Sequence, residues 1–457
     1  MLLKHFFLEK IAHSSYILAG SKSCAVIDPR RDADLYINEA RQMGVRITHI
    51  LETHLHADFI SGHMDLAAKT GAKIYAPKSG KCTFEHVAVS EGDSFTIEDM
   101  KLDVLETPGH TPEHIVYVVT DQSRGTSPIG AFVGDVMFVG DVGRPDLFPD
   151  IAEELAGKLY HSLHDKLLKL PDYCEIYPAH GAGSLCGRAM GAKWTSTIGY
   201  ERNFNPSLKI KDKNKFIQSL TSNMPPAPDH FSRCSDINRK GPEMLSRLPG
   251  MEELTAPEFK ERMQAKGCLV LDTRSYPAFA GFHIPGSWHL DIGGNFPTFA
   301  GWVIPPDRDI LIVADTYQDA ANARLWMQRV GIDRTAAYLG GGMQGWINNG
   351  YQTGTISLIS AEYLYNLVNK DKKSFTLVDV RAPLEYETAH IEGSVNIPAP
   401  ELRFRSDEIK KEKPVYLICS TGNRSSLAAS ILKQNGFTDV YHVPGGMTGY
   451  SAAGYIK

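Results

Sequence analysis

The stretch ITHILETHLHADFISGH, residues 47–63, decides how the first half of the chain is interpreted. An apolar run leads into a loop that places His54, His56 and Asp58 two residues apart, with His63 close behind. Side chains that directly follow a strand leave the sheet at one edge, where they can converge on a metal ion. This spacing therefore predicts a metal site at the end of a strand.

Three further ligand-type residues occur at similar strand-to-loop junctions. They are His110 in ETPGHTPEH, Asp135 in AFVGDVMF and His180 in IYPAHGAG. A single histidine more often satisfies a buried polar neighbour than binds a metal. Ligand-type residues at four predicted strand ends make chance a poor explanation for the set, so we expect a metal centre.

The first 220 or so residues alternate short β-rich runs with helical patterns, which is typical of an α/β domain. Residues 221–250 are rich in proline and polar residues and have little periodicity, so we interpret them as a connector. The predicted first domain covers 1–238, with the connector beginning at about 221.

Beyond the connector the chain repeats itself. LVLDTRSYPAFAGFHIPGS (269–287) matches TLVDVRAPLEYETAHIEGS (376–394) at an offset of 107, and GGMQGW and GGMTGY match further on. In each copy strands alternate with helices, which predicts a parallel sheet covered on both faces. We therefore expect two copies of one α/β domain, at 252–355 and 356–457.

The last copy contains a loop suited to nucleophilic chemistry. VYLICSTGNRSSLAAS runs from an apolar strand through Cys419 into a helix, with Arg424 five positions later. The unpaired N–H groups of a helix N-terminus and the arginine charge both stabilise a thiolate. A buried cysteine taken alone is usually a small apolar residue, but the strand, loop and helix together favour a catalytic Cys419 and Arg424.

The first copy departs from this pattern. Asp315 and Ala320 stand where Cys419 and Arg424 stand in the second copy. It has neither nucleophile nor anion-binding charge, so we expect it to space, pack or dimerise the active units. Its tryptophans are predicted to be core or interface anchors: Trp288, Trp302, Trp326 and Trp346.

The motifs THLHADFISGH, TPGHT, GD and PAHG, in this order, resemble the metallo-β-lactamase superfamily, and FVGDVMFVGDVGRPDL makes the persulfide dioxygenases the most similar members. The resemblance implies an αββα sandwich and one Fe(II) per chain, held by His54, His110 and Asp135. Two imidazoles and one carboxylate leave open positions, as in non-haem iron(II) enzymes that activate O₂. Hydrolases of the superfamily commonly have a histidine where this chain has Phe59, which weakens a second metal site.

Other residues receive supporting roles. His56, Asp58 and His180 are expected to orient ligands or water around the metal. By resemblance, Arg144 and Asp146 contact the anionic part of the thiol substrate; a structural arginine–aspartate turn is the alternative. Cys186 is more plausibly structural than a persulfide carrier.

The final copy, with its CSTGNRS loop, resembles a rhodanese, a sulfurtransferase whose cysteine carries a persulfide. The whole chain resembles fusions of a persulfide dioxygenase and rhodaneses with an inactive middle repeat. The implied activity is oxidation of a thiol persulfide by O₂ to sulfite, coupled to sulfur transfer to or from thiosulfate in sulfide detoxification. The alternatives are a dinuclear zinc thioester hydrolase and a non-enzymatic docking or sulfide-sensing module.

Composition narrows the choice of partners. The chain has 457 residues, 42% of them hydrophobic, and a net charge of −5. It lacks the basic field that collects nucleic acid and an apolar run that spans a membrane. Seven cysteines without paired short spacings favour a reducing cytoplasm. We expect a homo-oligomer whose partners are O₂, sulfite or thiosulfate, and a persulfide of glutathione, coenzyme A or bacillithiol.

Overall fold

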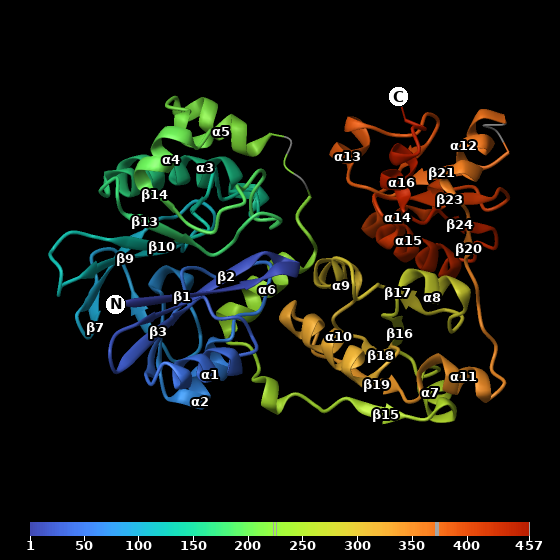
Figure 1. The fold of residues 1–457 in the computed structure, drawn as a ribbon, viewed down its shortest axis with the longest axis horizontal. Helices are drawn as coiled ribbons and strands as arrows, with labels where there is room; N and C mark the ends of the chain where they lie inside the picture. The colour runs from blue at the N-terminus through green and yellow to red at the C-terminus, as the bar shows by residue number, and fades with distance from the viewer. Residues whose placement is uncertain (223, 225, 371–373, 457) are drawn as a thin grey trace. The chain divides into compact units, whose positions relative to one another are not determined.

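The computed structural model describes residues 1–222, 224, 226–370 and 374–456. The contacts divide the chain into two compact units (Figure 1). The first unit comprises Met1–Leu248 with Gln328–Gly331, and the second comprises Pro249–Met327 with Ile332–Lys457.

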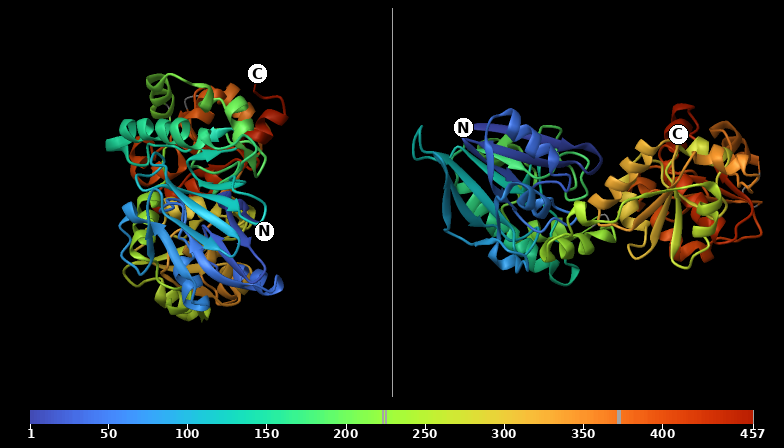
Figure 2. Two further views of the ribbon diagram at one scale, coloured as in Figure 1. Left: turned by 90° about the vertical axis from the view of Figure 1, so that its left-hand side faces the viewer. Right: turned by 90° about the horizontal axis from the view of Figure 1, so that it is seen from below.

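Within its described residues, the first unit contains two six-stranded sheets with helices on their outer faces (Figures 1 and 2). One sheet has the order β1-β2-β3-β4-β5-β6 and the other β14-β13-β10-β9-β8-β7. Their strands are β1 (Leu2–Leu8), β2 (His13–Ala19), β3 (Ser23–Ile27), β4 (Arg46–Leu51), β5 (Lys73–Pro77), β6 (Val87–Val89), β7 (Ser94–Ile97), β8 (Met100–Glu106), β9 (Ile115–Asp121), β10 (Gly130–Gly134), β13 (Glu175–Pro178) and β14 (Ser196–Thr197). A small ribbon pairs β11 (Met137–Phe138) with β12 (Asp141–Val142), and the helices are α1 (Asp34–Gln42), α2 (His63–Thr70), α3 (Ala152–His161), α4 (Ile198–Phe204), α5 (Lys213–Thr221) and α6 (His230–Lys240).

Strand β2 shows why these layers form. Its side chains alternate between two apolar cores, since successive residues of a strand point to opposite faces. Tyr16 and Leu18 pack into the core between the two sheets. Ile17 and Ala19 pack into the core that includes residues of α1 and α2. Both faces of the strand are covered, so the predicted αββα sandwich is confirmed.

The second unit contains two parallel five-stranded sheets in its described part, with orders β15-β19-β18-β16-β17 and β20-β24-β23-β21-β22. The first repeat consists of β15 (Glu252–Leu254), α7 (Ala256–Arg262), β16 (Cys268–Asp272), α8 (Tyr276–Gly281), β17 (Trp288–His289), α9 (Phe296–Val303), β18 (Asp309–Val313), α10 (Tyr317–Arg329), β19 (Thr335–Leu339) and α11 (Gly342–Asn348). The second consists of β20 (Ser357–Leu358), α12 (Ala361–Lys370), β21 (Thr376–Asp379), α13 (Pro383–Thr388), β22 (Val395–Asn396), α14 (Leu402–Arg405), β23 (Val415–Ile418), α15 (Asn423–Gln434), β24 (Val440–His442) and α16 (Gly446–Ala452). The equivalent strand orders confirm the predicted duplication.

The segment predicted as a connector contains a helix that the sequence pattern did not indicate. Within 221–250 the structure forms helix α6, whose Asn238 is buried against the metal-motif loop. The Asn238 side chain donates to the carbonyls of His56 and Phe59 at 2.8 Å and accepts from the Ser61 N–H at 2.8 Å. Phe231 and Cys234 of the same helix are also buried, so polar and apolar contacts both hold it in place.

Among the described residues, no helix has both the length and the apolar character needed to cross a bilayer.

Candidate metal centre and sulfur-transfer loop

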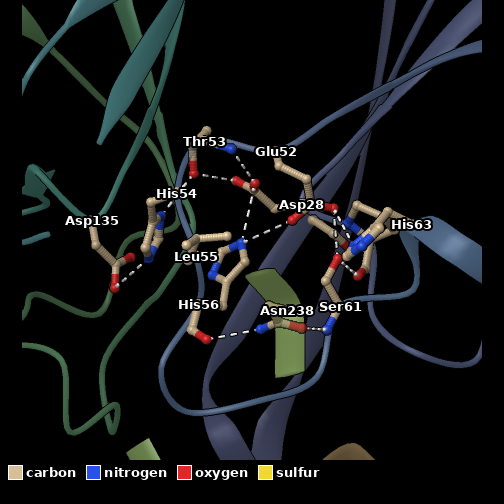
Figure 3. Close-up of polar contacts among 12 residues, drawn as sticks. Asp28, Glu52, Thr53, His54, Leu55, His56, Ser61, His63, Asp135 and Asn238 are labelled. Carbon is tan, nitrogen blue, oxygen red and sulfur yellow. Dashed lines mark hydrogen bonds and ion pairs between the residues drawn. The ribbon is translucent and has the colours of Figure 1, made fainter. Parts of the chain in front are cut away.

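Three strand ends of the first unit bring ligand-type side chains together. His54 follows β4, His110 follows β8 and Asp135 follows β10. The ligand atoms of these buried residues lie within 4.8 Å of one another. The Oδ2 atom of Asp135 is 3.4 Å from His110 Nε2 and 3.8 Å from His54 Nε2 (Figure 3 shows His54 facing Asp135).

Hydrogen bonds on the opposite side of each imidazole select its tautomer. His54 Nδ1 lies 2.9 Å from Thr53 Oγ1, and that hydroxyl donates to Asp28 at 2.9 Å (Figure 3). His110 Nδ1 lies 2.9 Å from the Arg144 carbonyl. Each Nδ1 therefore carries the proton, and each Nε2 presents a lone pair toward Asp135.

The two Nε2 atoms are buried and have no hydrogen-bond partner among the described residues. Unpaired buried polar atoms are costly, so their convergence needs an explanation. Burial lowers the pKa of both His54 and His110, which keeps the rings neutral. Neutral imidazole is the metal-binding form, so the three residues fit a divalent metal ion.

His180 supports Asp135 from behind. Its Nδ1 lies 2.8 Å from Asp135 Oδ1, and its Nε2 lies 2.8 Å from Asp58 Oδ2. Burial by itself would lower the pKa of His180, but the two carboxylates raise it well above the ordinary value. His180 therefore links Asp135 to Asp58 across its two ring nitrogens.

The backbone around Asp135 is also constrained. Its N–H donates to His114 Nε2 at 3.0 Å, and burial lowers the pKa of His114 to about 3, so this nitrogen stays an acceptor. A Cβ atom on Gly143 would come within 2.0 Å of the Asp135 carbonyl and 3.0 Å of His110 Cβ. Only glycine fits at this approach.

Two other groups of ligand-type side chains lie nearby. One comprises Asp58, His180 and Cys186, and the other Asp28, Glu52 and His56. In the second group His56 Nε2 lies 3.1 Å from Asp28 (Figure 3). The predicted supporting roles of His56, Asp58 and His180 match these positions and stay predictions.

Arg144 and Asp146 pair with each other. The guanidinium donates to both carboxylate oxygens, at 2.7 and 2.6 Å, and to the Leu185 carbonyl at 3.2 Å. The Arg144 side chain is buried, and its own carbonyl holds His110. In this arrangement the residue acts through its backbone on a metal-facing histidine; its predicted contact with substrate stays a prediction.

Sequence reasoning missed His13. This buried histidine packs 4.1 Å from the Phe59 ring and 5.6 Å from the His180 ring, measured between centroids. Neither ring nitrogen has a hydrogen-bond partner among the described residues. His13 begins a strand instead of following one, so the strand-end pattern could not reveal it.

In the second unit, Cys419 directly follows β23 and faces the start of α15. The Gly422 N–H donates to Cys419 Sγ at 3.1 Å, and Ser425 Oγ lies 3.4 Å from the same sulfur. The Met447 N–H donates to the Cys419 carbonyl at 2.7 Å, which anchors the loop to the Gly-Gly turn. The loop therefore offers hydrogen-bond donors to a sulfur anion.

Arg424 is paired with a residue that the sequence analysis missed. Its guanidinium contacts both carboxylate oxygens of Glu385, at 2.5 and 2.8 Å, and donates to Ser420 Oγ at 2.6 Å. Burial would raise the pKa of Glu385, but Arg424 and Ser420 outweigh it and lower the pKa to about 2. Glu385 is therefore ionised at any working pH. In the other repeat, the exposed Asp315 and buried Ala320 replace Cys419 and Arg424.

Comparison with known proteins relates both halves of the chain to known families. The metallo-beta-lactamase superfamily profile matches residues 9–180, and the rhodanese-like domain profile matches residues 255–349 and 360–453. The mitochondrial persulfide dioxygenase ETHE1 of Mus musculus is 31% identical over 249 residues, which cover 52% of this chain and 88% of that protein. The chain belongs to the metallo-beta-lactamase superfamily. It has ETHE1 persulfide dioxygenase homologues and carries two rhodanese-like domains.

Two further relatives are informative. A hydroxyacylglutathione hydrolase of Pseudomonas entomophila is 32% identical over 221 residues, covering 48% of this chain and 81% of that protein. A solved structure described as a metallo-beta-lactamase from Staphylococcus aureus is 34% identical, with a TM-score of 0.66, and covers 74% of this chain and 98% of that chain. The superfamily relationship thus includes enzymes of two chemistries.

The Thr53 hydroxyl behind His54 can be tested. Thr53→Val removes the acceptor for the His54 Nδ1 proton, so we expect metal affinity to fall about 10- to 100-fold. Chelator competition with zinc(II) or iron(II) measures this affinity. Thr48→Val is the matched control. It removes a threonine hydroxyl that lies 2.8 Å from Nδ1 of the adjacent His49, which is not one of the three proposed ligands. Equal effects of the two substitutions would contradict the assignment.

Proposed function

We propose that the first unit is a non-haem iron persulfide dioxygenase and that the second transfers sulfane sulfur through Cys419. The observation that carries the first assignment is the convergence of His54 Nε2, His110 Nε2 and Asp135 Oδ2 within a buried cluster. Two neutral imidazoles and one carboxylate form the ligand set that non-haem iron(II) oxygenases use. Homology to the persulfide dioxygenases supports the same reading.

Iron(II) bound by His54, His110 and Asp135 would supply open coordination positions for the terminal persulfide sulfur and O₂. The overall reaction consumes a persulfide, O₂ and water and yields sulfite, the free thiol and protons. The chain's own part is to hold the ligands. Thr53 and the Arg144 carbonyl orient the two imidazoles, and His180 holds Asp135.

The surroundings of this cluster favour one metal ion. Phe59 is fully buried and packs 4.4 Å from the His56 ring and 4.1 Å from the His13 ring, so hydrocarbon occupies this side. His180 is committed to two carboxylates.

A second candidate function is thioester hydrolysis with two metal ions. Similarity to the hydroxyacylglutathione hydrolase and the nearby group Asp58, His180 and Cys186 favour it. Against it stand the contacts of His180 with Asp58 and Asp135, which already use both ring nitrogens. We place it second, and metal stoichiometry separates the two.

For the second unit, Cys419 would attack the sulfane sulfur of thiosulfate through its thiolate. The sulfur–sulfur bond of thiosulfate breaks, sulfite leaves with the electron pair, and a persulfide forms on Cys419. A thiol or sulfite then takes the sulfane sulfur from the Cys419 persulfide. When a thiol persulfide is the donor and sulfite is the acceptor, the same two steps produce thiosulfate. Glu385 neutralises Arg424, so donors of high negative charge bind more weakly than they would to a bare arginine.

The thiol carrier is proposed to be glutathione, coenzyme A or bacillithiol, in a reducing cytoplasm. Arg144 could contact an anionic group of this thiol only after exchange of its Asp146 contact. Oxygen uptake compared across the three persulfides tests the choice of carrier.

We expect anaerobically loaded protein to bind about one iron per chain and to consume O₂ only when a persulfide is present. His110→Ala should abolish both iron binding and O₂ uptake. The control variant His161→Ala changes an exposed histidine outside the cluster and should preserve both. Metal analysis and an oxygen electrode give the result. A pair of zinc ions per chain with cleavage of a glutathione thioester would instead favour the hydrolase.

Cys419→Ser should lower thiosulfate sulfurtransferase activity by more than about 100-fold, because a neutral hydroxyl is a poor nucleophile. Persulfide-dependent O₂ uptake should remain. Cys268→Ser, in the other repeat, is the control and should retain sulfur transfer. Retained activity in the Cys419 variant would refute the assigned nucleophile.

Glu385→Gln keeps hydrogen-bonding atoms beside Arg424 but removes the negative charge. We expect the KM for thiosulfate, a dianion, to fall about two- to tenfold, since the arginine charge is no longer balanced. Steady-state kinetics of the thiosulfate reaction measure this change. Glu387→Gln, at an exposed position of the same helix, should leave KM unchanged; a rise in KM for Glu385→Gln would contradict the charge argument.

A further inference from the structure

We propose that the repeat without a catalytic cysteine completes the Cys419 site of the other repeat. His289 acts as a positioning residue for the start of α15, and Tyr276 covers the glycine whose N–H binds the cysteine sulfur. The inference rests on the proposed sulfurtransferase function. It assigns the degenerate repeat a task in sulfur transfer beyond spacing or packing.

The first step concerns what shapes the loop. Gly422 N–H and Ser425 Oγ lie 3.1 and 3.4 Å from Cys419 Sγ, and both belong to the junction between the loop and α15. Ser425 also donates to the Gly422 carbonyl at 3.0 Å. Any displacement of the first turns of α15 therefore moves the donors that face the sulfur.

His289 of β17 holds these turns (Figure 1 shows β17 beside α15). Its Nε2 donates to the Arg274 carbonyl at 2.8 Å, which leaves Nδ1 as an acceptor for the Ser426 hydroxyl at 2.9 Å. Its backbone N–H donates to Ser430 Oγ at 3.1 Å, one helical turn further on. The four residues that take part are all buried: Arg274, His289, Ser426 and Ser430. Burial lowers the pKa of His289, so its ring stays neutral.

The equivalent residue of the active repeat shows that this contact belongs to the degenerate copy. At the offset of 107, Asn396 corresponds to His289. The Asn396 amide donates to the carbonyls of Asp379 and Arg381, both at 2.9 Å, and so serves its own repeat. Histidine at 289 keeps the contact with the arginine carbonyl and adds a second nitrogen that reaches the neighbouring helix.

Tyr276 acts on the other side of the loop. It is the first residue of α8, and its N–H donates to Asp291 at 3.0 Å. A Cβ atom on Gly422 would lie 3.1 Å from Tyr276 Cε1 and 3.3 Å from His442 Nε2. The tyrosine ring therefore lies against Gly422, whose φ of +121° also requires glycine.

These contacts have a chemical consequence. The Gly422 N–H stabilises negative charge on the cysteine sulfur only while it points at Sγ, and the ring of Tyr276 keeps water from this side of the glycine. Donors held in place and shielded from water stabilise an anion more than mobile, solvated ones. Substitution of Tyr276 or His289 should therefore change kcat more than the KM for thiosulfate.

The experiment compares full-length variants in the thiosulfate:cyanide assay and in pH-dependent alkylation of Cys419, followed by mass spectrometry of its peptide. His289→Phe and Tyr276→Ala should each lower kcat about three- to tenfold with KM changed less than about twofold. The midpoint of the alkylation profile should move to higher pH. His289→Asn places at this position the residue that serves its own repeat at Asn396, without the second nitrogen that reaches Ser426, so it should lower kcat as His289→Phe does.

Matched controls come from the same repeat. His283 stacks on Phe279 as His289 does, at 4.1 and 4.4 Å between ring centroids, and bonds the Phe279 carbonyl. His283→Phe therefore shows the effect of removing a buried histidine that has no hydrogen bond to α15. Tyr317→Ala shows the effect of removing an exposed tyrosine from the same repeat. Both should leave the alkylation profile unchanged.

If His289→Phe and Tyr276→Ala match these controls in kcat and alkylation, the proposal is overturned. If His289→Phe does not fold, Ser426→Ala removes the other end of the same hydrogen bond and should reproduce the loss of turnover; unchanged kinetics in that variant overturn it equally. Absence of thiosulfate activity in the unmodified protein would sink the proposed function instead. The alkylation profiles would still report whether the degenerate repeat positions the Cys419 loop.

Discussion

The metal cluster depends on hydrogen bonds made on the far side of its imidazoles. Thr53 and the Arg144 carbonyl each take the Nδ1 proton of a histidine, so the two Nε2 lone pairs must face Asp135. An imidazole free to rotate would find a hydrogen-bond partner inside the protein and lose its metal-facing orientation. The sheets hold these partners rigidly, because each follows or adjoins a buried strand. Ligand geometry is thus prepared before any ion binds.

Charged groups also lie behind the cluster. Asp58 and Asp135 both contact His180, each 2.8 Å from a different ring nitrogen. Phe59 is fully buried, and its ring centroid lies 4.4 Å from that of His56. Members of one superfamily can differ in chemistry through a few side chains while the sandwich stays the same.

The tandem repeats show the same principle in another form. Both copies keep the strand order and the Asp-x-Arg pair, in which the arginine side chain contacts the aspartate at 2.7 Å in one repeat and 2.6 Å in the other. One copy retained Cys419, and the other replaced it and directs His289 toward its neighbour. The two copies thus share one fold and differ in the side chains at their loops and at the buried contact between them.

The sequence alone determined the architecture, the duplication and the presence of ligand-type residues at strand ends, because apolar periodicity and residue spacing are local properties. Spacing alone left seven candidate ligands, and the family resemblance selected His54, His110 and Asp135 among them; the structure brings the ligand atoms of these three residues within 4.8 Å of one another. His13 and Glu385 could not be found from the sequence, and neither could the helix in 230–240, since their roles come from partners far away in the chain. Tertiary packing decided which nitrogen of each imidazole faces the cluster, because that choice depends on what lies behind the ring.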